Sequence, residues 1–552
     1  MSSINEIADD YVSRFSALNP IAATSAGISG HDDLMPDLSP AGFDAITDLS
    51  KATLAAITRT QAADAREQTA KEAMIERLTI AIERYDIGDI AADVNVVASW
   101  VQGVRQVFDL MPTESDESRQ NVIARMRQVP TAYQGLRRTY LEAAARGHVA
   151  PRRQVLACAK QCAEWSAADS GFYYELARRL ASTGTASVEL DRAAELASAG
   201  TAEFGRFLET ELLPIATERD AVGRDRFALA SRYFLGATID AGEAYAWGWS
   251  EVIRIGDEMR RIAAKIVPGG SVAEAAAALD ADPERRISGR RALRDWMQEV
   301  ADAAIAELNG AHFDIPEPAR RIEAMIAPTG DGGIYYTGPS EDWTRPGRMW
   351  WALPAGLEDF STWKELTTIY HEGVPGHHLQ VAQTVYMRDQ LNRWQRLFGF
   401  VPGHGEGWAL YAERLMDDLG YLADPGNKLG MLDGQLLRAA RVVVDVGLHA
   451  ELPVPADSSW RPGEQWNADL VWEYLRSLVQ LDDQMLRFEV DRYLGWPGQA
   501  SCYKLGERIW LSARDEVRNR QGAAFDLKRF HSQALALGPL GLDPLRVALT
   551  RL

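Results

Sequence analysis

Histidine is scarce in this chain but concentrated in one stretch. Five of the nine histidines lie within the 79 residues that run from His371 to His449. The densest part reads Tyr370-His371-Glu372-Gly373-Val374-Pro375-Gly376-His377-His378-Leu379-Gln380. Imidazole nitrogens and carboxylate oxygens are the common ligands of a catalytic zinc ion, and a neighbouring glutamate can act as the general base. The cluster therefore predicts a metallohydrolase.

The spacing of the histidines departs from the ordinary H-E-x-x-H zinc signature, in which the two ligands lie four residues apart on one helix face. His371 and His377 are six residues apart, so a regular helix would separate them by about 240° around its axis. Pro375 lacks a backbone donor and clashes with the carbonyl of His371, while Gly376 frees the backbone. We therefore expect a bulged or broken turn that brings His377 beside His371.

A helix is expected to carry the first histidine. Thr362-Trp363-Lys364-Glu365 has the form of a capping box, which predicts a helix start there and places His371 two turns inside.

Residues 321–354 are rich in Gly, Tyr, Trp and Ile, and they predict a small antiparallel sheet before that helix. The best strand candidates are Ile334-Tyr335-Tyr336 and Met349-Trp350-Trp351-Ala352-Leu353, with turns at Thr329-Gly330-Asp331-Gly332-Gly333 and Pro346-Gly347. An exposed strand edge there could hold an extended peptide by strand addition, although the aromatic residues could equally just cover the core.

The rest of the chain predicts a mainly α-helical protein. Apolar residues recur at three- and four-residue spacings, for example over residues 63–85, 193–213 and 272–279. Breaks are expected at Asn19-Pro20, Pro36 to Pro40, Pro151, Pro268-Gly269-Gly270 and Pro316 to Pro318. We expect one catalytic unit built from two helical lobes around a cleft, an N-terminal lobe over residues 1–309 and a catalytic lobe over residues 310–552.

The composition of the chain indicates which binding partners and which cellular compartment to expect. The net charge is −19 with the acidic residues dispersed, which argues against a nucleic-acid or anionic-membrane partner. The N-terminal residues show no signal or transit pattern, and no apolar run approaches the ~18–20 residues of a membrane span. Three cysteines in so long a chain indicate a reducing compartment, so we expect a cytoplasmic protein.

Three segments carry a resemblance to a known family. His371 to Gln380 resembles the H-E-x-x-P-G-H-x-x-Q signature of a bacterial family of unknown function, predicted metallohydrolases related to the gluzincin peptidases. Glu406-Gly407-Trp408-Ala409-Leu410-Tyr411-Ala412-Glu413 is similar to that family's E-G-W-A-x-Y-x-E segment, and Pro497 to Gly506 to its P-G-Q-A-x-x-Y-x-x-G segment. The early Asn19-Pro20 to Gly27 stretch also looks familial, so the resemblance covers almost the whole chain.

The resemblance implies a gluzincin-like fold and a ligand set for one zinc ion per chain. His371, His377 and Glu406 would hold the metal, and two imidazoles with one carboxylate leave a position open for water. Glu372 would take the proton of that water as general base and pass it to the leaving amine. Manganese or cobalt would also suit these ligands.

Other residues near the motifs have less certain roles. His378 could replace His377 as a ligand or orient a neighbouring side chain. Glu413, seven residues after Glu406 and on nearly the same helix face, is expected to accept a hydrogen bond from a ligand imidazole rather than to bind metal. His404 precedes that helix in a predicted loop, where it could touch substrate or simply be exposed.

An amide hydrolase also needs a donor for the oxyanion of its tetrahedral intermediate. Tyr503 is the leading candidate, and His449 is its rival. Arg441 or Lys504 could bind a substrate carboxylate. Arg441 would do so through two parallel N–H donors, and Lys504 as a single compact charge. The alternative for the charged residues near His449 is ion pairing within their own helix.

The sequence thus predicts a zinc-dependent hydrolase that acts on short peptides or amides. One alternative is an amidase that trims an acyl or aminoacyl group from a specialised metabolite with the same chemistry. Another is a binding or scaffold protein on a degenerate metallopeptidase fold, although every chemical role is filled in this chain.

Overall fold

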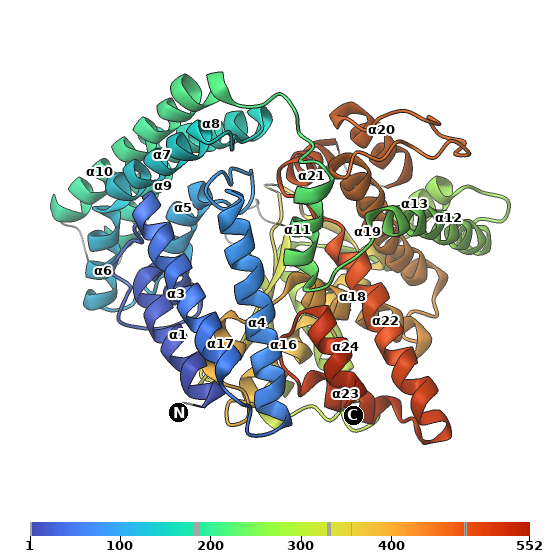
Figure 1. Cartoon of the computed structure of the whole chain (residues 1–552). Coiled ribbons are helices and arrows are strands. Elements are labelled where there is room, and N and C mark those ends of the chain that lie inside the picture. The colour runs from blue at the N-terminus through green and yellow to red at the C-terminus, as the bar shows by residue number, and fades with distance from the viewer. Residues whose placement is uncertain are drawn as a thin grey trace. The chain divides into compact units, whose positions relative to one another are not determined.

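Helices make up most of the protein, as the sequence predicts (Figure 1). The computed structural model describes residues 3–181, 188–327, 333–354, 356–479, 481 and 483–551. The chain divides into two compact units. Unit 1 comprises residues 1–63, 77–222 and 487–496, and unit 2 comprises residues 64–76, 223–486 and 497–552. This division does not coincide with the one expected at residue 309, because residues 223–309 pack within unit 2, where α12 (Ala241–Ile266) lies along α19 (Pro425–His449).

Unit 1 is a layered helical assembly in which α10 packs against α7, α8 and α9. Its core contains Tyr133 stacked on Phe204, with ring centroids 4.5 Å apart. The helices of this unit are α1 (Ile4–Leu18), α2 (Pro20–Ser25), α3 (Pro40–Arg59), α5 (Trp100–Leu110), α6 (Asp116–Met126), α7 (Val129–Ala145), α8 (Arg152–Trp165), α9 (Phe172–Leu180) and α10 (Val188–Phe207), followed by the short η2 (Leu208–Leu212) and η3 (Leu213–Ile215). Residues 77–86 of α4 (Ala65–Asp86) and most of α21 (Asp483–Gly495) also belong to it.

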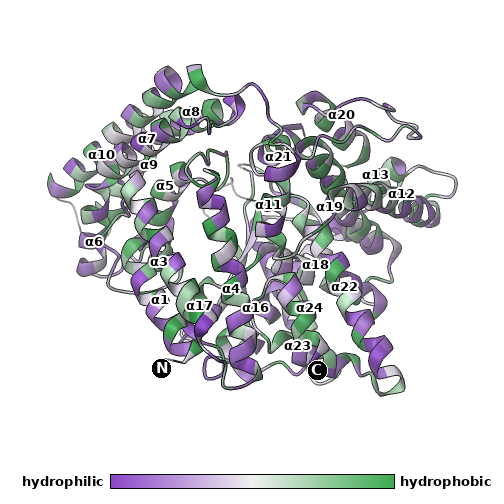
Figure 2. Ribbon diagram, viewed as in Figure 1, coloured by the Kyte–Doolittle hydropathy of each residue, from purple (hydrophilic) through white to green (hydrophobic). Residues whose placement is uncertain are grey.

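Unit 2 contains all the motif segments. Its main packing pairs are α12 with α19, α18 with α22, and α15 with α19. Hydrophobic and hydrophilic residues are interspersed along most of these helices (Figure 2). Helix α12 buries one face, whereas α18 and α19 are buried on all sides over residues 407–413 and 439–449. Besides α12 and α19, the helices are α11 (Arg224–Leu235), α13 (Val272–Ala281), α14 (Arg290–Leu308), α15 (Thr362–Glu372), α16 (His377–Tyr386), α17 (Arg393–Phe398), α18 (Pro402–Asp418), α20 (Ala468–Leu478), α22 (Cys502–Gln521), α23 (Leu527–Leu535) and α24 (Leu542–Thr550), with the short η4 (Pro283–Arg285), η5 (Glu317–Arg320) and η6 (Gly522–Ala524).

The predicted sheet exists, but it is mixed rather than antiparallel. Its order is β2 (Ile322–Ile326), β4 (Gly347–Trp351), β3 (Ile334–Thr337), with β2 parallel to β4 and β3 antiparallel to β4. The expected strand at 334–336 is present, and the one at 349–353 begins two residues earlier than expected. The expected turn at 329–333 lies outside the described residues except for Gly333. A second pair, β1 (Arg286–Ser288) with β5 (Asp359–Ser361), was not predicted.

The helix that carries His371 begins at Thr362 as expected, but not through the predicted capping box. Its N-cap is Ser361, whose side chain makes no cap hydrogen bond. The partly buried Glu365 carboxylate instead accepts a hydrogen bond from the Trp351 indole (2.7 Å). Tertiary pairing with the sheet has therefore displaced the local capping interaction.

A buried ion network ties α12 to α19 and α22. Lys504 donates to the Gln435 amide and the Glu507 carboxylate, and its Nζ lies 3.4 Å from Glu251 Oε1. Glu251 also receives both arms of Arg254, at 2.7 and 2.8 Å. Burial opposes ionisation of Glu251, but Arg254 and the other cations outweigh it and lower its pKa from 4.5 to about 2. Lys504 is thus placed as a structural cation.

We expect the ionised Glu251 carboxylate to make the free energy of unfolding depend on pH in the acid range. A carboxylate whose pKa is lower in the folded than in the unfolded chain stabilises the fold above its unfolded pKa, and this contribution is lost as pH falls through the folded value. Glu251→Gln should lower the free energy of unfolding by about 3 kcal/mol at pH 7. The difference from wild type should shrink as pH falls from 4.5 towards about 2. Denaturant unfolding across this range, with the exposed Glu299→Gln as control, measures it; a pH-independent difference would contradict the pairing.

None of the described helices combines the length and the apolar character that crossing a membrane requires.

Candidate metal site

The break between α15 and α16 brings the two histidines together, as the spacing predicts. Helix α15 ends at Glu372 and α16 begins at His377, and the Val374–Pro375 peptide bond between them is cis. The rings of His371 and His377 lie 4.8 Å apart and nearly perpendicular, at 89°. Gly376 is required in this break, because a Cβ there would lie 1.9 Å from the carbonyl oxygen of His371.

Glu406 comes from the first half of α18 and completes a group of three. Its Oε2 lies 3.3 Å from Nε2 of His371 and 3.4 Å from Nε2 of His377. One ligand atom from each residue lies within 4.8 Å of the others. Ligand bonds of about 2.1 Å in tetrahedral geometry place neighbouring ligand atoms about 3.4 Å apart, so the group fits a single zinc-sized ion.

Two contacts hold α18 in place against this break. The Trp408 indole donates to the carbonyls of Pro375 (2.9 Å) and Gly376 (3.2 Å), which fastens the helix to the turn between the histidines. Gly407 lets α18 approach α22 closely, since a Cβ there would lie 2.4 Å from the carbonyl carbon of Gly506. The glycines and the tryptophan of the two later motifs thus position the metal group.

The structure places Glu413 one layer behind the group, on the other nitrogen of His371. His371 Nδ1 donates to Glu413 Oε1 (2.8 Å), and Thr367 donates to Glu413 Oε2 (2.7 Å). A proton held on Nδ1 leaves the lone pair of Nε2 directed at the space shared with Glu406.

Removing the charge of Glu413 should therefore weaken the metal site without removing a ligand. We expect Glu413→Gln to lower metal affinity by about 10- to 100-fold, because the imidazole loses both its orientation and some of its basicity. Competition titration with a metal-binding dye measures this. Asp418→Asn, an exposed change on the same helix, is the control and should leave affinity unchanged; equal affinity in both variants would contradict the assigned role.

The electrostatics of the group favour a bound cation. The buried carboxylates of Glu372 and Glu413 and the partly buried carboxylate of Glu406 surround two imidazoles. Burial opposes the charge of Glu406, but His377 and His371 outweigh it and hold the pKa of that carboxyl well below its usual range. Burial likewise opposes protonation of His371, but hydrogen bonds with Glu406 and Glu413 raise the pKa of its imidazole to about 10. A divalent ion would supply the positive charge that a proton otherwise supplies here.

Glu372 lies beside the group without belonging to it. Its side chain is buried, and Oε2 has no hydrogen-bond partner among the described residues. Burial raises the pKa of this carboxyl against the opposing effect of His377 and His371. A poorly solvated carboxylate with a raised pKa is suited to accept and return a proton near neutral pH.

The second histidine of the pair His377-His378 is used differently from the first. His378 Nε2 donates to the carbonyl of Ala319 (2.8 Å), so Nδ1 accepts from the hydroxyl of Tyr336 (2.9 Å). Burial lowers the pKa of His378 to about 4, so the ring is neutral. With both nitrogens occupied, His378 joins α16 to β3 instead of joining the metal group.

His404 lies in the first turn of α18 and not in the predicted loop. Its ring is buried and stacks on Trp510, with centroids 5.2 Å apart, and burial lowers its pKa to about 3. The helix begins at Pro402, four residues before the motif that starts at Glu406, and its first turn is a favoured position for proline. This burial favours a packing role over substrate contact.

The remaining predicted residues cluster around the start of α22. The guanidinium of Arg441 lies over the Tyr503 ring, 5.0 Å from its centroid. His449 is fully buried, with Nε2 3.9 Å from Asp445 Oδ1. Asp445 in turn accepts from the backbone of Gly498 (3.1 Å) and Ser501 (3.0 Å), so it holds the P-G-Q-A turn. An oxyanion role for Tyr503 or His449 stays a prediction.

Three residues contribute to the metal site although they were assigned no role in it from the sequence. Thr367 supports Glu413, and Arg438 on α19 favours the charged forms of Glu372 and Glu413, although burial still raises the pKa of Glu372. Gln380 is buried one turn after His377, and neither polar atom of its amide has a partner among the described residues. Only Gln380 left a signal in the sequence, as the last residue of the first motif.

Comparisons with known proteins agree with this fold. The family profile described as "Bacterial protein of unknown function (DUF885)" matches residues 20–549. Among curated proteins no significant match is found. The chain is similar to "the putative lipoprotein from Colwellia psychrerythraea", with 22% identity, a TM-score of 0.84 and coverage of 100% of this chain and 99% of the other. It is also similar to "a putative lipoprotein of unknown function from Shewanella oneidensis", with 17% identity, a TM-score of 0.77 and full coverage, 100%, of both chains. At these identities the likeness shows a shared fold.

Proposed function

The chain belongs to the DUF885 family of bacterial proteins of unknown function, and on this premise we propose that it is a metal-dependent hydrolase of amide or peptide bonds. The convergence of His371, His377 and Glu406 beside Glu372, whose Oε2 has no hydrogen-bond partner among the described residues, carries this proposal. We also propose the relation to the gluzincin peptidases, zinc as the native metal and a cytoplasmic location.

The proposed reaction also gives parts to the residues that surround the metal ligands. A bound zinc ion would supply Lewis acidity towards the scissile carbonyl and the attacking water. Glu372 accepts the proton of that water and returns it to the leaving amine, which keeps the charge of the site constant over the cycle. Glu413 keeps the proton of His371 on Nδ1, and Arg438 balances part of the negative charge of Glu372 and Glu413.

A short, extended peptide suits the surroundings of the group. β3 is an edge strand of the three-stranded sheet, and the Tyr336 to His378 hydrogen bond holds it to α16 directly after the ligand His377. A peptide that adds to a strand edge pairs through its backbone, which gives affinity without strict demands on side chains.

Metal-dependent hydrolysis of a mixed library tests the proposal. Purified protein is incubated with short peptides and with N-acyl amides, before and after removal of metal by a chelator, and after return of zinc, manganese or cobalt. We expect cleavage that is lost with the metal and restored by zinc. Cleavage of acyl amides alone would identify the amidase alternative. Stable metal-free protein that takes up no zinc and cleaves neither class would contradict the proposal and favour the binding alternative.

A further inference from the structure

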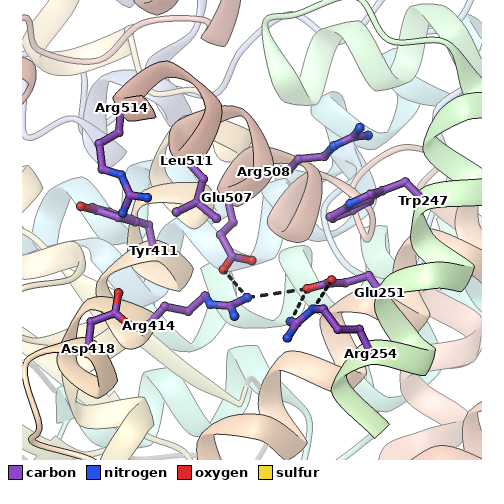
Figure 3. Close-up of a pocket in the computed structure, with 10 residues that line it drawn as sticks. All are labelled: Trp247, Glu251, Arg254, Tyr411, Arg414, Asp418, Glu507, Arg508, Leu511 and Arg514. Atoms are coloured by element: carbon purple, nitrogen blue, oxygen red, sulfur yellow. Dashed lines mark hydrogen bonds and ion pairs between the residues drawn. The ribbon is translucent and has the colours of Figure 1, made fainter. Parts of the chain in front are cut away.

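A second concave site lies in unit 2, between α12, α18 and α22 (Figure 3). The pocket has a volume of about 460 Å³, within the range of small-molecule sites. Its lining contains none of the three potential metal ligands. Charged groups dominate it, with four guanidinium groups and three carboxylates, from Arg254, Arg414, Arg508, Arg514, Glu251, Asp418 and Glu507.

The charges are layered by depth. The side chains of Glu507 and Glu251 are only 2% and 9% exposed, and Lys504 beneath them is 1% exposed. The side chains of Arg414 and Arg508 are 30% and 36% exposed. Of the three carboxylates only Asp418 is exposed, so arginines outnumber carboxylates on the accessible wall of the pocket, and Glu251 and Glu507 lie behind it.

Arg414 retains unused hydrogen-bonding capacity. Its Nη1 lies 3.6 Å from Oε1 of Glu251 and 3.6 Å from Oε1 of Glu507, which is an ion-pair distance and longer than a hydrogen bond. Figure 3 shows this guanidinium between the two carboxylates, below Leu511. A guanidinium carries five N–H donors, and Arg414 donates none of them to another described residue at hydrogen-bond distance.

Arg508 lies next to an apolar surface and has three N–H donors that make no hydrogen bond to another described residue. Two of its donors bind Glu243, and its guanidinium lies 4.7 Å from the centroid of the Trp247 ring. Trp247 and Leu511 both line the pocket. A planar guanidinium matches the oxygens of a carboxylate or phosphate, and the apolar side chains suit a hydrocarbon part of the same ligand.

We propose that this pocket is a second binding site, separate from the metal group, for a small organic anion whose carboxylate or phosphate is bound by Arg414 and Arg508. Its position on α18 is notable because Arg414 directly follows Glu413, which holds His371. The same helix therefore carries both sites on different faces.

Calorimetric titration tests this proposal with three probes. 4-Methylpentanoate and inorganic phosphate carry the two oxyanions, and 4-methylpentanol is the uncharged match of the first. We expect saturable binding of at least one anion and none of the alcohol, and the anion that binds more tightly identifies the headgroup. Arg414→Gln and Arg508→Gln should each weaken binding by at least about tenfold. Arg260→Gln, an exposed arginine elsewhere on α12, should not change it.

One further variant distinguishes anion binding in this pocket from anion binding at the metal group. Binding of the anion to Glu406→Gln should equal binding to wild type, whether or not the protein proves to be a hydrolase. Loss of binding in Glu406→Gln would place the anion at the metal group and overturn the proposal. No saturable binding, equal binding of the alcohol, or unchanged binding in folded Arg414→Gln and Arg508→Gln would also overturn it and leave the arginines as structural ion pairs.

Discussion

Replacing Glu372 with glutamine is expected to lower the rate of hydrolysis by about 10³-fold while the metal content stays at the wild-type level. Glutamine has nearly the same shape but cannot accept the proton of the attacking water. Glu372 is outside the group formed by His371, His377 and Glu406, so its neutral replacement removes no ligand. The measurement is the initial rate of cleavage of the best library substrate, with metal content determined on the same sample.

The matched change is Glu365→Gln, about two turns earlier on α15, where the carboxylate accepts from Trp351. This variant should retain most of the activity if it folds. A Glu372→Gln protein that is as active as wild type would rule out Glu372 as the general base. Loss of metal together with activity would instead show that Glu372 is a ligand.

The adjacent histidines His377 and His378 are expected to behave oppositely when each is replaced by alanine. His377→Ala removes one of three ligands and should weaken zinc binding by more than about 100-fold, since loss of a partner that merely orients a ligand already costs up to that much. His378→Ala breaks the contacts to Tyr336 and Ala319 and should lower the free energy of unfolding by about 2 kcal/mol, with metal binding retained.

Zinc titration and denaturant unfolding of both variants measure these effects. The two changes are equal in chemistry and neighbouring in sequence, so a difference between them reports position alone. Retained zinc affinity in His377→Ala, with loss of affinity in His378→Ala, would exchange their assigned parts.

The metal group could be predicted from the sequence because its chemistry depends on residue type and short spacing. The combination of proline and glycine between His371 and His377 predicts a broken helix. The break brings the two imidazole rings close enough to bind one metal ion. Glu406 could be chosen only through resemblance, since a ligand 35 residues after His371 is brought close by helix packing and not by local spacing.

The errors arose where tertiary contacts outweighed local patterns. Glu365 fits a capping box but bonds to Trp351 on the neighbouring sheet. The direction of β2 beside β4 depends on how the intervening chain returns, which alternation of residues does not encode. His404 was expected in a loop because it lies among glycines, yet Gly403 and Gly405 are glycines because neighbouring side chains leave no room for a Cβ.

The most direct test of the metal site is the metal content of purified wild type beside His371→Ala and Glu372→Gln, determined by mass spectrometry. The proposed site predicts close to one zinc per chain in wild type and in Glu372→Gln, and little in His371→Ala. Equal metal in all three proteins, or none in any of them after zinc supplementation, would contradict the site.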